Sequence, residues 1–317
     1  MKPWIDVDPQ TFQPMRIQAV SHHLSDHPLL QLGSLVDLAK RLVPIGAARF
    51  HSGAVDAGTS FVDAPKAHPV GRPPAEILAD IENANAWFSL HNIQVDEVYR
   101  RFVGDVLDSV RPIVEARDPG MHFRAGWIFV SSPGAVTPYH LDHEHNFILQ
   151  IRGTKVVHVF DPLDPEIVSQ EALERFHGAG SRELVAYRPE FEARGHAFHV
   201  GPGLGAFMPS NAPHWVKNDD NVSITVSFTW FSRETRRRRA LFQLNQSLRA
   251  RGVTPRPVGA NPLLDEVAAR GYEAWLATRH RIDRLQGRPF HDLDVPFATN
   301  PPGSEYGTAS APNARCP

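Results

Sequence analysis

Cysteine is almost absent from this chain of 317 residues, whose single cysteine is Cys316. This excludes an internal disulfide framework and a thiolate metal cage, so any metal would be held by carboxylates and by some of the 17 histidines. Lys and Arg number 33 against 35 Asp and Glu, so neither nucleic acid nor an anionic membrane is expected as a partner. No run approaches the roughly 20 apolar residues of a membrane span, and the first residues lack a signal-peptide pattern. We expect a soluble, cytoplasmic protein.

Hydrophobic periodicity divides the chain into four parts. Apolar residues recur every three or four positions in residues 29–42 and 95–114, which predicts amphipathic helices. Helical patterns return at residues 233–251 and 262–285, and the last residues are rich in Pro, Gly, Ser and Ala. The predicted organisation is an N-terminal helical segment packed on the core (1–118), a β core (119–232), C-terminal helices (233–288) and a flexible tail (289–317).

The middle of the chain has the pattern of a β-rich core. Short runs of β-branched and aromatic residues, separated by Gly and Pro, predict strands at residues 127–130, 146–151, 155–160, 196–200, 205–208 and 221–231. The last run alternates: Ser223, Thr225, Ser227 and Thr229 share one face, and apolar residues occupy the other. A polar face on an otherwise buried strand indicates a wet cavity inside a sandwich or barrel.

Three residues of the β core form a candidate metal-ligand set. His140 and Asp142 are two positions apart, so on an extended chain both side chains point to the same face and can reach one ion. His214, 72 residues after Asp142 in the segment PSNAPHWVKN, offers a third ligand. Two histidines and one carboxylate form the facial triad of non-haem Fe(II) oxygenases, which leaves positions open for substrate and O2.

Lys155 lies 13 residues after Asp142, directly beyond an Arg-Gly-Thr turn, and begins an apolar strand. A lysine in this position is either exposed at the end of the strand or points inward toward a partner. Pointing inward without a partner, its ammonium would cost several kcal/mol or lose its proton. A bound dicarboxylate would supply the partner.

The stretch from Thr137 to Lys155, together with the segments PSNAPHWVKN and SITVSFTWF, resembles the JmjC and cupin-like Fe(II)/2-oxoglutarate-dependent oxygenases. The resemblance is closest to the asparaginyl hydroxylase that inhibits hypoxia-inducible factor. It covers residues 127–231 and includes the ligand spacing, a threonine three residues before the first ligand, an asparagine six after it and a lysine fifteen after it.

The resemblance implies a role for each matching residue. His140, Asp142 and His214 would bind Fe(II), and they would be the catalytic centre. Lys155 and Thr137 would bind the distal carboxylate of the cosubstrate 2-oxoglutarate.

Two further residues and the fold also follow from the resemblance. Asn146 would lie near the cosubstrate, and Ser227 stands where the family often has asparagine. The implied fold is α+β with a mainly β core: a double-stranded β-helix (cupin, jelly roll) of eight strands with N-terminal and C-terminal helices outside it. In related hydroxylases the C-terminal helices form a homodimer, and residues 233–285 could do so here.

The implied activity is that of a dioxygenase that hydroxylates a protein or peptide side chain and releases succinate and CO2. A small-molecule 2-oxoglutarate oxygenase and a non-enzymatic metal-binding cupin scaffold are the alternatives, and a demethylase fits less well because the chain has no chromatin-reader motif. The sequence does not name the prime substrate. It also leaves open the roles of His143, Glu144 and His145, although strand parity places His143 and His145 away from the metal.

Overall fold

The computed structural model describes residues 3–179 and 185–286, so the predicted tail at 289–317 lies outside the described residues. The strands are β1 (Ile5–Asp6), β2 (Gln18–His22), β3 (Ala48–Ser52), β4 (Ala86–Leu90), β5 (His122–Ser131), β6 (Val136–His140), β7 (His145–Arg152), β8 (Lys155–Val159), β9 (His196–Val200), β10 (Leu204–Met208), β11 (His214–Asn218) and β12 (Ser223–Phe231). The α-helices are α1 (Leu32–Leu42), α2 (Ala64–Ala67), α3 (Pro74–Ala79), α4 (Glu97–Glu115), α5 (Gln170–Ala179), α6 (Arg233–Arg249) and α7 (Pro262–Leu285). Short 3-10 helices are η1 (Pro28–Leu30), η2 (Val43–Ile45), η3 (Ile93–Val95) and η4 (Pro189–Arg194).

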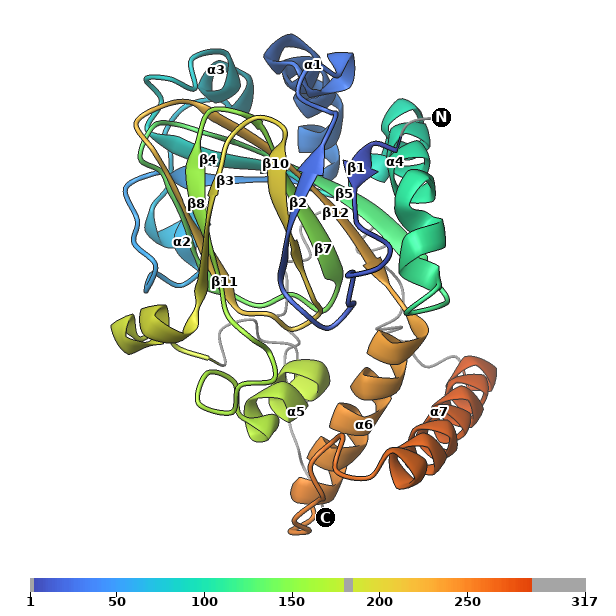
Figure 1. Cartoon of the computed structure of the whole chain (residues 1–317). Helices are drawn as coiled ribbons and strands as arrows, with labels where there is room; N and C mark the ends of the chain where they lie inside the picture. The colour runs from blue at the N-terminus through green and yellow to red at the C-terminus, as the bar shows by residue number, and fades with distance from the viewer. Residues whose placement is uncertain (1–2, 180–184, 287–317) are drawn as a thin grey trace.

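Two β-sheets form the core of the molecule (Figure 1). The larger sheet has the strand order β1-β2-β10-β7-β12-β5-β4-β3, and the smaller has the order β6-β11-β8-β9. The strands from β5 to β12 are shared equally between them, with β5, β7, β10 and β12 in the larger sheet and the others in the smaller one. This division is that of a double-stranded β-helix, so the fold expected from the sequence is confirmed.

Periodicity predicted a helical N-terminal segment, but the structure shows that this segment also contains strands. It contains α1 and α4 close to their expected positions, but it also supplies the four strands β1–β4 to the larger sheet. β2 pairs with β10 at one side of the jelly roll, and β4 pairs with β5 at the other. These strands are five residues long or shorter. Short pieces of this kind carry little periodicity of their own, and pairing with an existing sheet edge decides their conformation.

The larger sheet buries its outer face against helices of the N-terminal segment (Figure 1). The apolar face of β12 lies there as predicted, in one cluster with the buried residues of α1 and α4. Phe102 of α4 packs edge-on against Phe228 of β12, with ring centroids 5.6 Å apart. Gly126 allows this close approach, because a Cβ at this position would lie 2.8 Å from side-chain atoms of Ile93 and Val103.

The polar face of β12 points into the space between the two sheets. At one end Thr225 donates a hydrogen bond to Gln150 at 2.8 Å, and further along the strand Ser227 and Thr229 line a cavity. The turn between β7 and β8 contains Gly153 at φ +73°, a position where a Cβ would lie 2.2 Å from neighbouring oxygen atoms. Glycine is therefore required there, and the turn places Lys155 as the first residue of β8.

The helices α5, α6 and α7 gather at one end of the β core (Figure 1). Ser232 caps α6 in a capping box with Thr235, which fixes the direction in which the chain leaves β12. α7 begins at Pro262 and packs on α6. Within the described ranges there is no helix with the length and apolar character needed to cross a membrane.

Candidate metal centre and ligand cavity

His140, Asp142 and His214 come together in the structure. Each offers one ligand atom, and these atoms lie within 4.8 Å of one another. His140 ends β6 and His214 begins β11, and the two are register partners in the antiparallel β6–β11 pair. Asp142 follows β6 by two residues, and its Oδ2 lies 3.8 Å from Nε2 of His214. This set of two imidazoles and one carboxylate could hold a divalent metal ion on one face and leave the opposite positions open.

Hydrogen bonds to the backbone orient both imidazoles. Nδ1 of His140 lies 2.8 Å from the carbonyl oxygen of Pro138, and Nδ1 of His214 lies 3.0 Å from the carbonyl oxygen of Ala212. A carbonyl accepts only, so each Nδ1 carries the proton and each Nε2 keeps its lone pair. Such a bond fixes the tautomer and the ring orientation of a metal-binding histidine.

The backbone of the third member, Asp142, is tied to the loop that precedes His214. The amide of Asn211 donates to the carbonyl oxygen of Asp142 at 2.8 Å. Asn211 has φ +67°, a conformation that asparagine adopts more readily than most residues. Its side chain accepts a hydrogen bond from Nε2 of His177, 3.0 Å away. The segments that carry Asp142 and His214 are thereby held together.

The three residues open into a cavity between the sheets. All seven residues that the sequence singled out line it: Thr137, His140, Asp142, Asn146, Lys155, His214 and Ser227. Lys155 is 4% exposed. Its burial away from water lowers its pKa from 10.5 to about 7. Among the described residues no carboxylate pairs with it, so the cavity presents a buried amine that an anion would stabilise in its charged form.

Several polar side-chain atoms in the cavity are also unsatisfied. Asn146 Oδ1, Ser227 Oγ and Thr229 Oγ1 are buried and have no hydrogen-bond partner among the described residues. Thr137 accepts a hydrogen bond from the indole of Trp87 at 2.8 Å, which leaves its hydroxyl proton for another acceptor. Buried polar groups normally find partners. The hydroxyls of Ser227 and Thr229 can donate to a small polar anion beside a metal ion, whereas Oδ1 of Asn146 requires a donor.

A family model described as a cupin-like domain matches residues 75–237, which is more than half of the 317 residues. The chain belongs to this cupin-like family. Human HSPB1-associated protein 1 is 26% identical over 124 residues, a match that covers 37% of this chain and 25% of the human protein. The cupin-like protein thus matches about a quarter of the length of that relative.

Solved structures with a similar arrangement include one protein from Escherichia coli. The X-ray structure of YcfD aligns over 93% of the cupin-like protein and 76% of YcfD, with 16% identity and a TM-score of 0.49. A structure of YcfD described as a ribosomal oxygenase, in complex with cobalt and 2-oxoglutarate, aligns over 89% and 70%, with 18% identity and a TM-score of 0.44. Similarities this low do not assign a function to the cupin-like protein.

Some residues that pack beside the metal centre were not predicted from the sequence. Phe61 stacks on the imidazole of His140, with ring centroids 4.0 Å apart and an interplanar angle of 9°. The guanidinium of Arg49 lies 4.7 Å from the centre of the same Phe61 ring. Phe61 belongs to a Gly-, Pro- and Ala-rich loop without periodicity, so no local pattern predicts its role.

Thr229 also lines the cavity. The sequence could have predicted this residue as part of the site, because it shares the polar face of β12 with Ser227.

His143 and His145 lie away from the cavity, as expected, although residues 141–144 form a loop between β6 and β7 and not a continuous strand. His143 stacks on Phe176 at a centroid distance of 3.8 Å, and His145 is fully buried beside Asp118. Neither residue lines the cavity, whereas Glu144 does. The cupin-like protein therefore has one cluster of His and carboxylate ligands among its described residues.

Proposed function

We propose that this cupin-like protein is an Fe(II)- and 2-oxoglutarate-dependent dioxygenase that hydroxylates a side chain of a protein or peptide. One observation supports this proposal above all: a single cavity contains both the His140, Asp142 and His214 set and the buried Lys155, with which no carboxylate of the described residues pairs. A metal-binding scaffold requires only the three ligands. The buried amine adds a cost in folding free energy that a scaffold does not need to carry.

The three ligands would hold the metal and leave the open face of the site for other molecules. Nδ1–H of both histidines is already engaged by carbonyl oxygens, so both Nε2 atoms are ready to coordinate without a change of tautomer. When bound, Fe(II) with 2-oxoglutarate and O2 supplies an oxidation in which 2-oxoglutarate becomes succinate and CO2 and a C–H bond becomes C–OH. The residues of the chain position the reactants and exclude water.

Lys155 and Thr137 would bind the distal carboxylate of 2-oxoglutarate. The ammonium supplies the charge, and the Thr137 hydroxyl, held by Trp87, supplies a hydrogen bond. The hydroxyls of Ser227 and Thr229 would donate to the cosubstrate or the prime substrate, and Oδ1 of Asn146, beside the cosubstrate, would accept from a donor on the prime substrate. Ser227 can make this contact although the family often has asparagine at its position.

The prime substrate is proposed from the resemblance of residues 127–231 to protein hydroxylases. Aromatic residues form much of the remaining cavity wall: Phe61, Trp87, Trp127 and Phe129. Such a wall accepts an aliphatic or amide side chain. It also accepts a small apolar metabolite, so a small-molecule oxygenase is the alternative activity.

Anaerobic titration tests the metal and the cosubstrate together. Fe(II) and then 2-oxoglutarate are added to the purified protein without oxygen, and the visible iron-to-oxoglutarate charge-transfer band is recorded. His214→Ala and Lys155→Ala are measured beside the wild type. Lys217→Ala is the matched control, because Lys217 is exposed and lies on the neighbouring strand β11.

We expect the wild type and Lys217→Ala to develop the band at the same concentration of 2-oxoglutarate. His214→Ala should show no band, and Lys155→Ala should require far more 2-oxoglutarate. Iron binding without a band in the wild type would rule out the oxoglutarate chemistry and leave the scaffold. Absence of iron binding would reject the metal centre as well.

We further propose that α7 mediates a homodimer. Within the described chain α7 buries only Asp265 and Ala269, while large apolar side chains of the same helix are exposed: Leu263, Leu264, Val267, Trp275, Ile282 and Leu285. Five of them, from Leu264 to Leu285, are 3, 8, 7 and 3 residues apart in turn, which places them on one helical face. The first half of α7 has three acidic residues and one Arg, and the second half has three Arg and one acidic residue. Two copies packed antiparallel about a two-fold axis would bring opposite charges together.

A further inference from the structure

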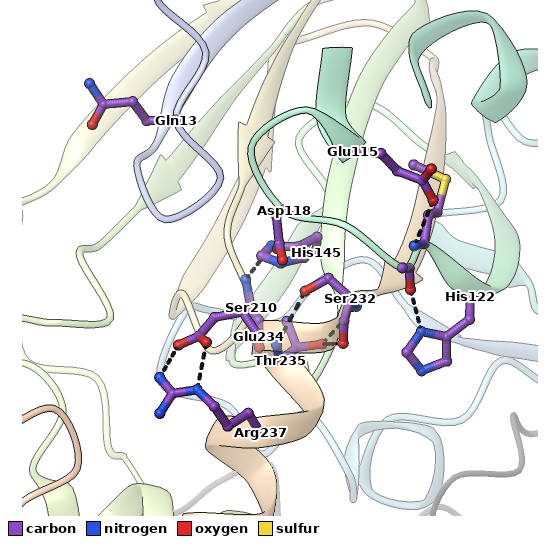
Figure 2. A network of polar contacts seen from close by, with 12 residues as sticks. Gln13, Glu115, Asp118, His122, His145, Ser210, Ser232, Glu234, Thr235 and Arg237 are labelled. Atoms are coloured by element: carbon purple, nitrogen blue, oxygen red, sulfur yellow. Dashed lines mark hydrogen bonds and ion pairs between the residues drawn. The ribbon is translucent and has the colours of Figure 1, made fainter. Parts of the chain in front are cut away.

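A buried polar network connects four segments of the chain (Figure 2), two of which continue into the segments that carry the proposed metal ligands. Asp118 lies in the loop after α4, His145 begins β7, Ser210 lies between β10 and β11, and Ser232 caps α6. All four are at most 4% exposed, and His145 is 0% exposed. Side chains this polar and this buried carry a desolvation cost that only good hydrogen bonds offset.

The donors around His145 assign its tautomer. The backbone amide of Ser210 donates to Nδ1 at 3.1 Å, so Nδ1 has no proton. Nε2 therefore carries the proton and donates to Oδ2 of Asp118 at 3.2 Å. Burial alone would raise the pKa of Asp118, but hydrogen bonds from His145 and Ser232 lower its pKa, so Asp118 remains an ionised acceptor. Both ring nitrogens of His145 are thus fixed by hydrogen bonds.

This imidazole joins the two segments that carry the metal ligands. His145 follows Asp142 by three residues, and Ser210 precedes His214 by four. The Ser210 hydroxyl donates to the carbonyl oxygen of His143 at 2.7 Å, and the amide of Asn211 donates to that of Asp142 at 2.8 Å. With the bond from Ser210 to His145, three hydrogen bonds cross between the segments over a few residues.

We propose that His145 is a positioning residue for the metal centre, and that its Nδ1 makes the contact that positions the ligands. By accepting the amide proton of Ser210, Nδ1 sets the path of residues 210–214 relative to Asp142, and so the separation of Asp142 and His214. Asp118 holds the tautomer that leaves Nδ1 free to accept. The inference rests on the proposed metal centre and adds to it a residue that touches neither metal nor substrate.

If His145 had a purely structural role, its loss would lower the stability of the protein but would leave its affinity for Co(II) unchanged. Its ring packs near Phe207 and Trp230, with centroid distances of 5.8 and 5.5 Å, so its loss would lower stability in any case. His22 provides a matched control because it is 4% exposed and has the same hydrogen-bond pattern. Its Nδ1 accepts from the amide of Leu24 at 3.1 Å, and its Nε2 lies 2.9 Å from the carbonyl oxygen of Gln150. His22 lies on β2 and does not line the cavity.

The experiment measures Co(II) binding to the metal-free full-length chain by its visible absorption, and thermal unfolding of the same samples. The variants are His145→Asn, His145→Gln, His145→Ala and His22→Ala. In His145→Asn, Oδ1 can replace Nδ1 as the acceptor for Ser210 but the side chain does not reach Asp118. In His145→Gln, the terminal amide can reach Asp118 but leaves the Ser210 amide without its acceptor.

We expect His145→Ala and His145→Gln to bind Co(II) about tenfold more weakly than the wild type, with altered absorption bands, as is typical when a group that orients metal ligands is lost. His145→Asn should stay within about threefold, by the same reasoning. His22→Ala should lose stability but retain the wild-type affinity and spectrum.

Two results would overturn the inference: equal Co(II) affinity in all His145 variants, or weakening in His145→Asn without weakening in His145→Gln. If His145→Ala does not fold, the comparison of the Asn and Gln variants still decides the matter. A wild type that binds no Co(II) would instead reject the metal centre, and His145 with it.

Discussion

His140 and His214 face each other across the β6–β11 pair, with ring centroids 4.2 Å apart. Each ring is held through Nδ1 by the carbonyl oxygen two residues before it. The same local arrangement is therefore used twice, once at the end of β6 and once at the start of β11. The antiparallel register of two strands that are distant in sequence brings the two Nε2 atoms to one place.

Removal of either histidine should abolish metal-dependent stabilisation. Wild-type protein at a free metal concentration about one hundred times Kd should gain about 2.7 kcal/mol of stability. His140→Ala and His214→Ala should gain nothing measurable, because two remaining ligands hold a metal weakly. The measurement is thermal unfolding with and without Co(II), and His196→Ala, at an exposed position on β9, serves as the control. A full metal-induced shift in His214→Ala would show that the ligand set is wrong.

Cosubstrate binding should depend on pH through Lys155. Its pKa is lowered to about 7 by burial, so above that pH the empty site holds a neutral amine. A dicarboxylate binds the charged form, and binding must then take up a proton. The apparent affinity for 2-oxoglutarate in the Co(II)-loaded protein should fall about tenfold for each pH unit above pH 7. Calorimetry in buffers of different ionisation enthalpy would detect the proton uptake.

The control for this pH dependence is Lys155→Arg, whose guanidinium stays charged throughout the range. It should bind more weakly than the wild type because of its size, but with a flat profile above pH 7. A wild type whose affinity is also flat above pH 7 would contradict the assignment of Lys155 to the carboxylate.

Lys155→Met should stabilise the ligand-free protein while it destroys cosubstrate binding. The folded-state pKa of about 7 lies below the ordinary value of 10.5, so the charged form is disfavoured in the folded state. The cost is present in full below pH 7, declines as pH rises toward 10.5, and is absent above it. At about 1.4 kcal/mol for each pKa unit, the gain in Lys155→Met should reach a few kcal/mol at neutral pH.

Thermal unfolding from pH 6 to pH 10 checks this prediction, with Lys217→Met at an exposed position as the control. The stabilisation of Lys155→Met should shrink as the pH rises. Equal stability of Lys155→Met and the wild type at pH 6 would show that the buried amine carries no cost.

A double substitution, Val267→Asp with Trp275→Asp, should separate the proposed dimer. These residues are 70% and 50% exposed and lie on one face of α7, where two charges would have to be buried on association. Light scattering coupled to gel filtration should give the mass of two chains for the wild type and of one for the variant. Val98→Asp, at a 56% exposed position on α4, should remain dimeric. A monomeric wild type at tens of micromolar would refute the dimer, and the apolar face would then be covered in another way.

The sequence predicted the β core but not its full extent. Six of the strands in the jelly roll followed from β-branched runs between Gly and Pro, whereas β6 and β11 were not predicted. Both are five residues long and contain proline, histidine or asparagine near their ends. The strands β1–β4 were missed for a related reason, since they become extended only by pairing with the edges of the larger sheet.

The candidate site was predicted more completely than the strands that carry it. The spacing of His140 and Asp142, the inward lysine and the polar face of β12 are local patterns, and chemistry constrains them residue by residue. Phe61 and Asp118 had no such signal. Phe61 reaches His140 from a loop, and Asp118 reaches His145 from the end of a helix, so only packing makes them neighbours.

The sequence by itself determined which residues could bind a metal and an anion, because ligand chemistry depends on the type of side chain and on its spacing along the chain. Tertiary structure alone decided three things: that His214 pairs in register with His140, that Lys155 is buried without a carboxylate among the described residues, and that His145 is fixed between Asp118 and Ser210. Each depends on contacts between segments far apart in the chain. Such contacts are set by the closure of the two sheets around one cavity, which no local pattern specifies.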